Sequence, residues 1–292
     1  MNPILVTGAR GQVGVEVCEK LLILGYKVIA CGHSDLDITS ENEVSSLFES
    51  TPISLVINCA AYTAVDKAED EEKAAYAVNA LGPKNLALEC KERDIPLIHI
   101  STDYVYDNGK TGLHIENEGT GTRCVYGKTK LFGERFILDS GVRAVILRAS
   151  WIFGRYGKNF VKAMANLAAS RDSLKVVCDE FGNPTPARAL ADDICYIADS
   201  ILNGSCTDFG VYNYCGYPSI VRNDFARVIL DKAREIGMLS HDVEVHPITS
   251  EEFGAKAKRP ADSRMNSDKF VNTFRRDLPD WRLYLEETLR GL

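Results

Sequence analysis

Tyr126 and Lys130 are the pair of side chains whose types and spacing point most directly to chemistry. They stand four residues apart at the start of a helical pattern, which places their Cβ atoms on one helix face about 6 Å apart. An ammonium group beside a phenol favours the phenolate, so we expect Lys130 to lower the Tyr126 pKa from its ordinary value of about 10. A tyrosine tuned in this way exchanges a proton with an alcohol or a carbonyl oxygen near neutral pH. The same spacing also occurs without function on solvated helix faces.

Three glycines near the N-terminus, Gly8, Gly11 and Gly14, follow an apolar run (residues 3–7) and precede a helical pattern (residues 15–24). The first two glycines let the backbone turn tightly and approach a pyrophosphate, and the third allows close packing of helix and strand. The helix N-terminus then faces the phosphates with its partial positive charge. Because a strand precedes and a helix follows, we expect a dinucleotide site here rather than a structural turn.

The end of the second strand-like run, residues 26–31, favours one nicotinamide cofactor over the other. A carboxylate that binds the ribose hydroxyls is expected there in NAD enzymes, and no acid follows this strand directly. The groups able to hold a 2′-phosphate instead are Arg10, His33 and Ser34. The sequence therefore favours NADPH, while Asp35 and Asp37 leave NADH as the alternative.

A further apolar run, residues 96–101, delivers Ser101, Thr102 and Asp103 to its C-terminal end. Ligands of an open parallel sheet bind at that end of the strands. A hydroxyl there can hydrogen-bond the substrate oxygen that Tyr126 protonates, although such residues often only cap or turn the chain. The order of glycine loop, strand-end hydroxyls and Tyr126 favours a catalytic role.

Strand-like runs alternate with helical patterns through the first 150 residues, which predicts a parallel sheet covered on both faces. Further strands are expected at residues 55–60 and 142–148, with helices at 41–50 and 71–91. After Trp151 the rhythm breaks, and the patterns are a helix at 159–169, a strand at 174–177, a loop at 182–186, a helix at 187–202, a strand at 210–214, a helix at 223–236, a strand at 243–246, a loop at 258–260 and a helix at 280–289.

These patterns predict an α/β fold with a doubly wound, mostly parallel, Rossmann-like sheet and a smaller C-terminal α/β substrate lobe. We expect residues 1–150 to form the dinucleotide-binding domain, rejoined by about 187–215. The substrate lobe then consists of residues 151–186 and 216–292.

The composition is that of an ordinary soluble globular protein, with 292 residues of which 45% are hydrophobic and 26% charged. The net charge of −7 argues against nucleic acid as a partner, and no apolar run approaches the roughly 20 residues of a membrane span. The nine cysteines are odd in number and form no Cys-x-x-Cys pair. With no signal sequence, they predict reduced thiols and a cytoplasmic location. A monomer and a homodimer are both compatible with the sequence.

Taken together, the motifs resemble those of the dTDP-4-dehydrorhamnose reductase family, within the extended short-chain dehydrogenases/reductases. The resemblance covers nearly the whole chain in order, on residues 8–14, 58–69, 101–106, 126–130, 148–154, 159–160, 182–185 and 259–260. It implies NADPH-dependent reduction of a nucleotide-linked 4-keto-6-deoxysugar, dTDP-4-dehydro-L-rhamnose giving dTDP-L-rhamnose. One alternative is another 4-keto sugar nucleotide, giving for example a 6-deoxy-talose. A second is a non-catalytic, cofactor-binding subunit like the similar β subunit of methionine adenosyltransferase.

The resemblance also implies roles for single residues. Thr102, Tyr126 and Lys130 match the catalytic triad of the family, with Tyr126 as proton donor to the C4 carbonyl oxygen and Lys130 also bonded to the nicotinamide ribose. Including the groups named above, the expected cofactor contacts are Gly8, Arg10, Gly11, Gln12, Val13, Gly14, His33, Ser34, Asp37, Ile38, Ala60, Ala61, Thr63, Asn79, Tyr126 and Lys130. The expected substrate contacts are Thr102, Asp103, Tyr126, Trp151, Asn159 and Arg259.

Two stretches depart from the family pattern. Some members bind Mg²⁺ through carboxylates at a dimer contact; Glu16 matches one of these positions, but Arg188 stands where another acid is expected. A cation cannot replace a carboxylate ligand, so we expect no metal site of this kind. Residues 119–125 lack the usual Asn/Asp-Pro approach to the tyrosine, which leaves the sugar nucleotide open.

Overall fold

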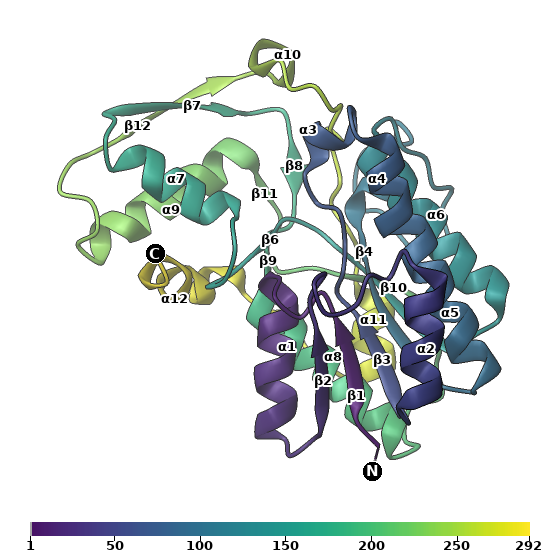
Figure 1. The fold of residues 1–292 in the computed structure, drawn as a ribbon. Coiled ribbons are helices and arrows are strands. Elements are labelled where there is room, and N and C mark those ends of the chain that lie inside the picture. The colour runs from purple at the N-terminus through teal and green to yellow at the C-terminus, as the bar shows by residue number, and fades with distance from the viewer. Residues whose placement is uncertain (1) are drawn as a thin grey trace.

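The computed structural model describes residues 2–292 and is built on a six-stranded parallel sheet (Figure 1). The strand order is β10-β5-β4-β3-β1-β2, and every neighbouring pair is parallel. The strands are β1 (Ile4–Thr7), β2 (Val28–Cys31), β3 (Leu55–Asn58), β4 (Leu97–Thr102), β5 (Ala144–Ala149) and β10 (Gly210–Tyr214). The predicted α/β class with a doubly wound parallel sheet is confirmed.

Helices cover both faces of this sheet because its strands are apolar on both sides. One face packs on α1 (Gln12–Ile23), α8 (Ala187–Leu202) and α11 (Asp268–Phe274). The other face packs on α2 (Glu41–Ser50), α5 (Gly82–Glu92) and α6 (Val125–Ser140). Neighbouring residues on β1 show the alternation, since Ile4 and Val6 belong to the first core and Leu5 to the second.

A smaller lobe lies beyond the C-terminal ends of the strands (Figure 1). Its core contains aliphatic and aromatic side chains, and within it the Phe225 ring lies 5.1 Å from Trp281 and 5.6 Å from Phe160. Its strands pair as β7 (Ser173–Val177) with β12 (Glu244–Ile248), β8 (Phe181–Gly182) with β11 (Ile220–Val221), and β6 (Ile152–Phe153) with β9 (Thr185–Pro186). Its helices are α7 (Phe160–Ala168), α9 (Arg222–Glu235), α10 (Ser250–Phe253), the 3₁₀ turn η3 (Trp281–Tyr284) and α12 (Leu285–Arg290).

The helix expected at residues 71–91 is divided into three parts. It consists of α4 (Glu72–Tyr76), the π-helical turn η1 (Ala77–Leu81) and α5. A Cβ atom at Gly133 of α6 would lie 2.2 Å from the backbone oxygen of Asn79 in η1. The wide turn and the glycine therefore let α6 approach this segment closely. The remaining short helices are α3 (Val65–Ala68) and the 3₁₀ turn η2 (Asp103–Val105).

We propose the same division into two units that the sequence predicted, with one extension. Strand β10 extends the main sheet and α8 packs on α1. Helix α11 also contributes Phe270 and Phe274 to the main core, although it lies in the range expected for the smaller lobe.

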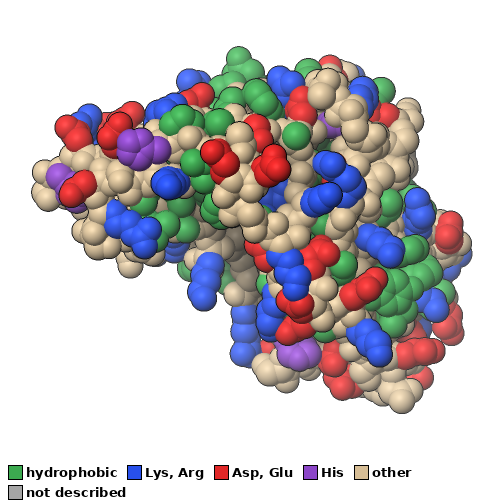
Figure 2. Space-filling model, turned by 90° about the horizontal axis from the view of Figure 1, so that it is seen from above, with side chains coloured by type: hydrophobic (Ala, Val, Ile, Leu, Met, Phe, Trp, Pro, Cys, Tyr) green, Lys and Arg blue, Asp and Glu red, His purple; other side chains and the backbone are tan. Residues whose placement is uncertain are grey.

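Over residues 2–292, no helix combines the length and the apolar character that crossing a membrane requires. Acidic and basic side chains are interspersed over the face seen from above (Figure 2).

A buried ion pair attaches α6 to the sheet. Glu134 of α6 and Arg148 of β5 are 1% and 4% exposed, and Arg148 Nη2 lies 2.6 Å from Glu134 Oε2. Arg148 also donates to the hydroxyl of Tyr106 at 2.7 Å, and Ser101 donates to Glu134. The pair raises the pKa of Arg148 further above its ordinary value, against the opposing effect of burial. Both charges are therefore compensated inside the core, as buried charges must be.

We predict that Arg148→Met lowers the free energy of unfolding by about 3–5 kcal/mol, because it leaves the Glu134 carboxylate buried without its partner. Urea denaturation followed by circular dichroism measures the change. The matched control is Arg290→Met, which breaks the exposed pair with Glu286 and should cost less than about 1 kcal/mol. Equal losses in the two variants would contradict the structural role of the buried pair.

Candidate active site

The glycine loop joins β1 to α1 at the C-terminal edge of the sheet. Gly8 has a left-handed backbone with a φ of +64°, a conformation that residues with side chains seldom adopt. A Cβ atom at Gly14 would lie 2.2 Å from the carbonyl oxygen of Gly8, so only glycine lets α1 begin this close to the loop. The first turn of α1 has no acidic side chain, and the N–H groups of such a turn bind anions. This arrangement fits a dinucleotide pyrophosphate.

A cavity of about 900 Å³ lies between this loop and the smaller lobe, within the usual size range of cofactor and substrate sites. Most of the predicted site residues line it. They are Gly8, Arg10, Gly11, Gln12, Val13, Gly14, His33, Asp37, Ile38, Ala60, Ala61, Thr63, Thr102, Asp103, Tyr126, Lys130 and Trp151. Segments more than 140 residues apart in sequence therefore meet around one cavity.

Four predicted residues do not line this cavity: Ser34, Asn79, Asn159 and Arg259. Asn159 caps α7, accepting a hydrogen bond from the Lys162 N–H at 3.1 Å and donating to Gln12 Oε1 at 3.0 Å. Arg259 pairs with Asp66, with 2.8 Å between Nη2 and Oδ2. The side chains of both residues are thus engaged with other parts of the chain in this structure.

Asn79 does not line the cavity itself but is hydrogen-bonded to Tyr62, which does. Its Oδ1 accepts from the Tyr62 N–H at 2.8 Å, and its Nδ2 donates to the Tyr62 carbonyl at 3.1 Å and to Thr129 Oγ1 at 3.1 Å. The side chain therefore ties the loop after β3 to α6. This role of Asn79 depends on the packing of η1 against α6, which the spacing of residues in the sequence does not reveal.

The Arg10 side chain, which lines the cavity, packs against Gly32 and pairs with Asp35. Arg10 Nη2 lies 3.0 and 2.9 Å from the two carboxylate oxygens of Asp35, and Asp35 also accepts from the Gly32 N–H at 2.8 Å. Ser34 is exposed, with its hydroxyl 3.5 Å from Asp35. Because one nitrogen of Arg10 makes both contacts, the remaining guanidinium N–H groups are available to an anion.

Thr102 terminates β4, and Tyr126 and Lys130 lie on the first turns of α6. The Tyr126 and Tyr104 rings meet edge to face at 5.2 Å. Lys130 is 1% exposed and donates to the Ile100 carbonyl at 2.6 Å.

The expected direction of the Tyr126 pKa shift is wrong. Burial raises the pKa of Tyr126, and the neighbouring Thr102 hydroxyl only partly offsets that effect. Lys130 donates to the Ile100 carbonyl and lies beside His99, so it does not offset the effect of burial on Tyr126 in the way that the spacing alone predicted. Tyr126 is therefore a neutral phenol near pH 7, a proton donor and not a phenolate.

Asp103, one residue after Thr102, is buried. Its carboxylate accepts from Ser263 Oγ at 2.6 Å and from Thr102 Oγ1 at 3.1 Å. Burial raises the Asp103 pKa to about 6, against those hydrogen bonds and the nearby charge of Arg222. Ser263 was not identified from the sequence, because no local motif marks a contact across 160 residues.

The smaller lobe closes the cavity with Trp151 and Arg222. Trp151 has a positive φ of 43°, which is strained in a bulky residue and is typical of functional sites. The Arg222 guanidinium lies 3.7 Å from the centre of the Trp151 ring and 3.0 Å from Glu180 Oε2. Arg222 lines the cavity and sequence reasoning missed it, since it is an unremarkable residue at the start of α9.

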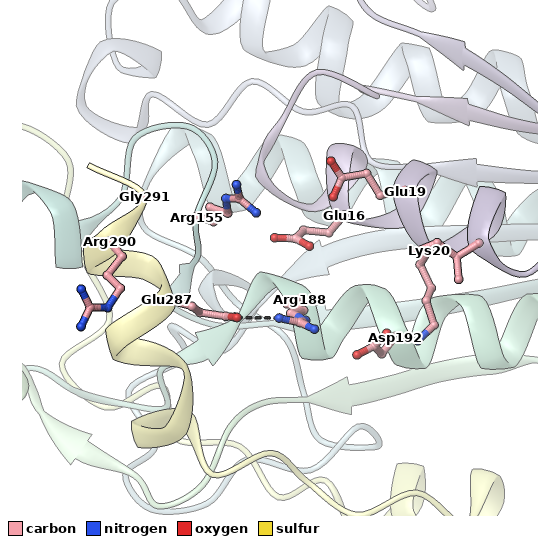
Figure 3. Close-up of a pocket in the computed structure, with 10 residues that line it drawn as sticks. Glu16, Glu19, Lys20, Arg155, Arg188, Asp192, Glu287, Arg290 and Gly291 are labelled. Atoms are coloured by element: carbon pink, nitrogen blue, oxygen red, sulfur yellow. Dashed lines mark hydrogen bonds and ion pairs between the residues drawn. The ribbon is translucent and has the colours of Figure 1, made fainter.

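A second cavity of about 510 Å³ lies between α1, α8 and α12 (Figure 3). Glu16 faces it, and burial together with Glu19 raises its pKa. Arg188 Nη1 lies 2.7 Å from Glu287 Oε2. The Glu287 carboxylate is therefore paired with the guanidinium of Arg188. Within residues 2–292, no group of three or more His, Cys, Asp or Glu side chains is arranged to hold a metal ion.

Comparison with known proteins identifies relatives over the full length. The family model described as RmlD substrate binding domain matches residues 1–292. The dTDP-4-dehydrorhamnose reductase of Aggregatibacter actinomycetemcomitans is 40% identical over 98% of both chains. That of Sinorhizobium fredii is 36% identical over 98% of this chain and 95% of its own.

Two solved structures have nearly the same fold. The dTDP-4-dehydrorhamnose reductase of Bacillus anthracis in complex with NADP has a TM-score of 0.89 and 32% identity, covering 100% of this chain and 99% of its own. The orthologue from Clostridium acetobutylicum has a TM-score of 0.89 and 36% identity, covering 99% and 98%. The resemblance seen in the sequence motifs is thus confirmed.

We predict that Arg10→Ala raises the KM for NADPH about tenfold, because it removes a charge-assisted contact to the 2′-phosphate, and changes the KM for NADH less than about threefold. Steady-state kinetics with each cofactor measures the effect. The matched control is Asp35→Asn, which releases Arg10 without removing it and should not raise the KM for NADPH. An equal rise in KM for NADPH and for NADH in Arg10→Ala would contradict this role for Arg10.

Proposed function

The chain belongs to the dTDP-4-dehydrorhamnose reductase family, and on that premise we propose that it reduces dTDP-4-dehydro-L-rhamnose to dTDP-L-rhamnose. As a member of this family it is an NADPH-dependent oxidoreductase that acts on a sugar nucleotide. The sugar, 4-dehydro-L-rhamnose, and the nucleobase of dTDP are the proposed details of this assignment. The nine free cysteines also support the cytoplasm as its location, where it acts as a monomer or a homodimer.

The observation that carries this proposal is that one cavity is lined by the glycine loop, by Thr102, Tyr126 and Lys130, and by Trp151 of the smaller lobe. A pyrophosphate site, a proton donor and an aromatic surface are the three parts that a sugar-nucleotide reductase requires. The cavity also has room for a cofactor beside a sugar.

NADPH, when bound, supplies the hydride for C4 of the sugar. Tyr126 supplies the proton to the C4 oxygen, and its raised pKa keeps the hydroxyl protonated until that oxygen becomes basic. Thr102 donates to Asp103 in this structure, so it turns from that carboxylate to the substrate oxygen, where its hydroxyl stabilises developing negative charge. Lys130 in its ammonium form stabilises the phenolate that Tyr126 becomes.

The nucleotide part of the substrate needs a cation at the other end of the cavity. We assign this contact to Arg222, whose planar guanidinium suits a diphosphate and is held over Trp151. Asn159 and Arg259 remain predicted contacts, and Arg259 requires release from Asp66 before it approaches an anion.

We predict that the purified protein oxidises NADPH only when dTDP-4-dehydro-L-rhamnose is supplied, and that Tyr126→Phe lowers kcat by a factor of about 10²–10⁴. Absorbance of NADPH measures turnover, and mass spectrometry and NMR of the product define the sugar and its C4 configuration. The control is Tyr217→Phe, which alters an exposed tyrosine.

Each result separates the alternatives. A 6-deoxy-talose product would reassign the substrate within the same chemistry. Cofactor binding without turnover on a panel of keto sugar nucleotides would favour a non-catalytic subunit, and undiminished turnover in Tyr126→Phe would remove the assigned proton donor.

We predict that Arg222→Met raises the KM for the sugar nucleotide by about 10-fold or more, through loss of a charged hydrogen bond worth about 1.5–3 kcal/mol, with no change in the KM for NADPH. Arg264→Met is the matched control, because Arg264 also pairs with an acid, Asp262, and stacks on an aromatic ring, Phe181, but does not line the cavity. Equal KM values in both variants would show that Arg222 does not contact the substrate.

A further inference from the structure

A row of buried polar side chains crosses the sheet beneath the cavity and ends on Lys130. Thr7, Asn58 and His99 occupy neighbouring register positions on β1, β3 and β4. Together with Lys130 they are at most 1% exposed. Polar groups buried to this degree must satisfy one another, so their hydrogen bonds determine where each proton lies.

The orientation of the Asn58 amide is fixed by a backbone donor. Asn58 Oδ1 accepts from the Ala60 N–H at 3.0 Å, and that group only donates. The same oxygen accepts from Thr7 Oγ1 at 2.7 Å. Asn58 Nδ2 is therefore the atom that faces His99 Nδ1 at 3.0 Å. Because an amide nitrogen only donates, His99 Nδ1 is an acceptor and has no proton.

The ring proton of His99 then lies on the other nitrogen. Burial holds the His99 pKa well below its ordinary value, and a charge on Lys130 would lower it further, so the imidazole is neutral and carries one ring proton. With Nδ1 accepting, that proton is on Nε2, which lies 3.3 Å from Lys130 Nζ. A ring N–H is received by the lone pair of an amine, whereas an ammonium group has no acceptor to offer.

The amine form of Lys130 satisfies every contact around it. Nζ donates one hydrogen to the Ile100 carbonyl, accepts the His99 Nε2–H and keeps one hydrogen for the cavity. Burial lowers the Lys130 pKa to about 8, against Glu134 and Cys59, which favour the charged form. Glu134 is already paired with Arg148, burial raises the thiol pKa of Cys59, and the Tyr126 hydroxyl is neutral. With a pKa of about 8, Lys130 passes from its ammonium form to its amine form just above neutral pH.

We propose that Thr7, Asn58 and His99 are positioning residues that direct the His99 Nε2–H at Lys130 and so favour its amine form. The consequence for turnover rests on the role proposed above for Lys130. The ammonium form assists Tyr126, so kcat/KM for reduction falls as the pH rises through the Lys130 titration. The row then sets the pH at which this fall occurs.

Asn58→Asp tests the proposal because it replaces the donor opposite Nδ1 with an acceptor of the same size. The ring proton then moves to Nδ1, and Nε2 becomes an acceptor for the Lys130 ammonium. The second variant, His99→Phe, keeps a ring but has no N–H. We expect the alkaline limb of kcat/KM for the sugar nucleotide, at saturating NADPH, to move upward by about one pH unit in both, a tenfold change in proton affinity.

A purely structural role predicts a different result, namely weaker activity at all pH values with the alkaline limb unmoved. That outcome in both variants would overturn the proposal.

Nitrogen NMR of the full-length protein labelled with ¹⁵N-histidine gives a readout that needs no turnover. The chain has five histidines, and His99→Phe identifies the His99 signals by their loss. We expect an unprotonated Nδ1 and a protonated Nε2 in the native protein, and the opposite tautomer in Asn58→Asp. A native Nδ1–H, or an imidazolium that titrates near pH 6.5, would overturn the proposal even if the substrate assignment stands.

Discussion

The buried ion pair between Glu134 and Arg148 is the contact on which the geometry of the cavity depends. A charged pair inside a core is tolerated only when its geometry is close and its remaining groups are bonded, so it fixes α6 in one position on β5. Gly133 beside it removes the Cβ atom that would meet η1. Tyr126 and Lys130 extend from the same helix and are therefore positioned by contacts that take no part in the reaction.

The proposed reacting end and the proposed recognition end of the cavity are built in different ways. Thr102 and Lys130 belong to the rigid sheet and the helix packed on it, where neighbouring strands hold each polar group to its partner. Trp151 and Arg222 belong to the smaller lobe, where the Trp151 ring stacks on Phe225, a member of a core of aliphatic and aromatic side chains. Proton transfer requires fixed distances, while recognition of a sugar nucleotide depends on the surface that this lobe presents.

The charged state of Lys130 links these observations to the chemistry. A lysine on a solvated helix face is an ammonium group, whereas here the sheet supplies an acceptor from Ile100 and a donor from His99. The row from Thr7 to His99 runs across strands whose ends line the cavity. The same strands therefore also hold the groups that surround Lys130.

The sequence by itself determined the parallel sheet, the glycine loop and the set of Thr102, Tyr126 and Lys130. These features depend on local patterns: strand ends in a parallel sheet share one edge, and residues four apart share one helix face. Only the tertiary structure decided that Lys130 meets His99, that Arg259 is held by Asp66, and that Arg222 covers Trp151. Those pairings join residues that are distant in sequence and meet only through packing. Composition and local spacing do not reveal such contacts. Burial likewise reversed the expected shift of the Tyr126 pKa, because desolvation depends on the whole surrounding fold.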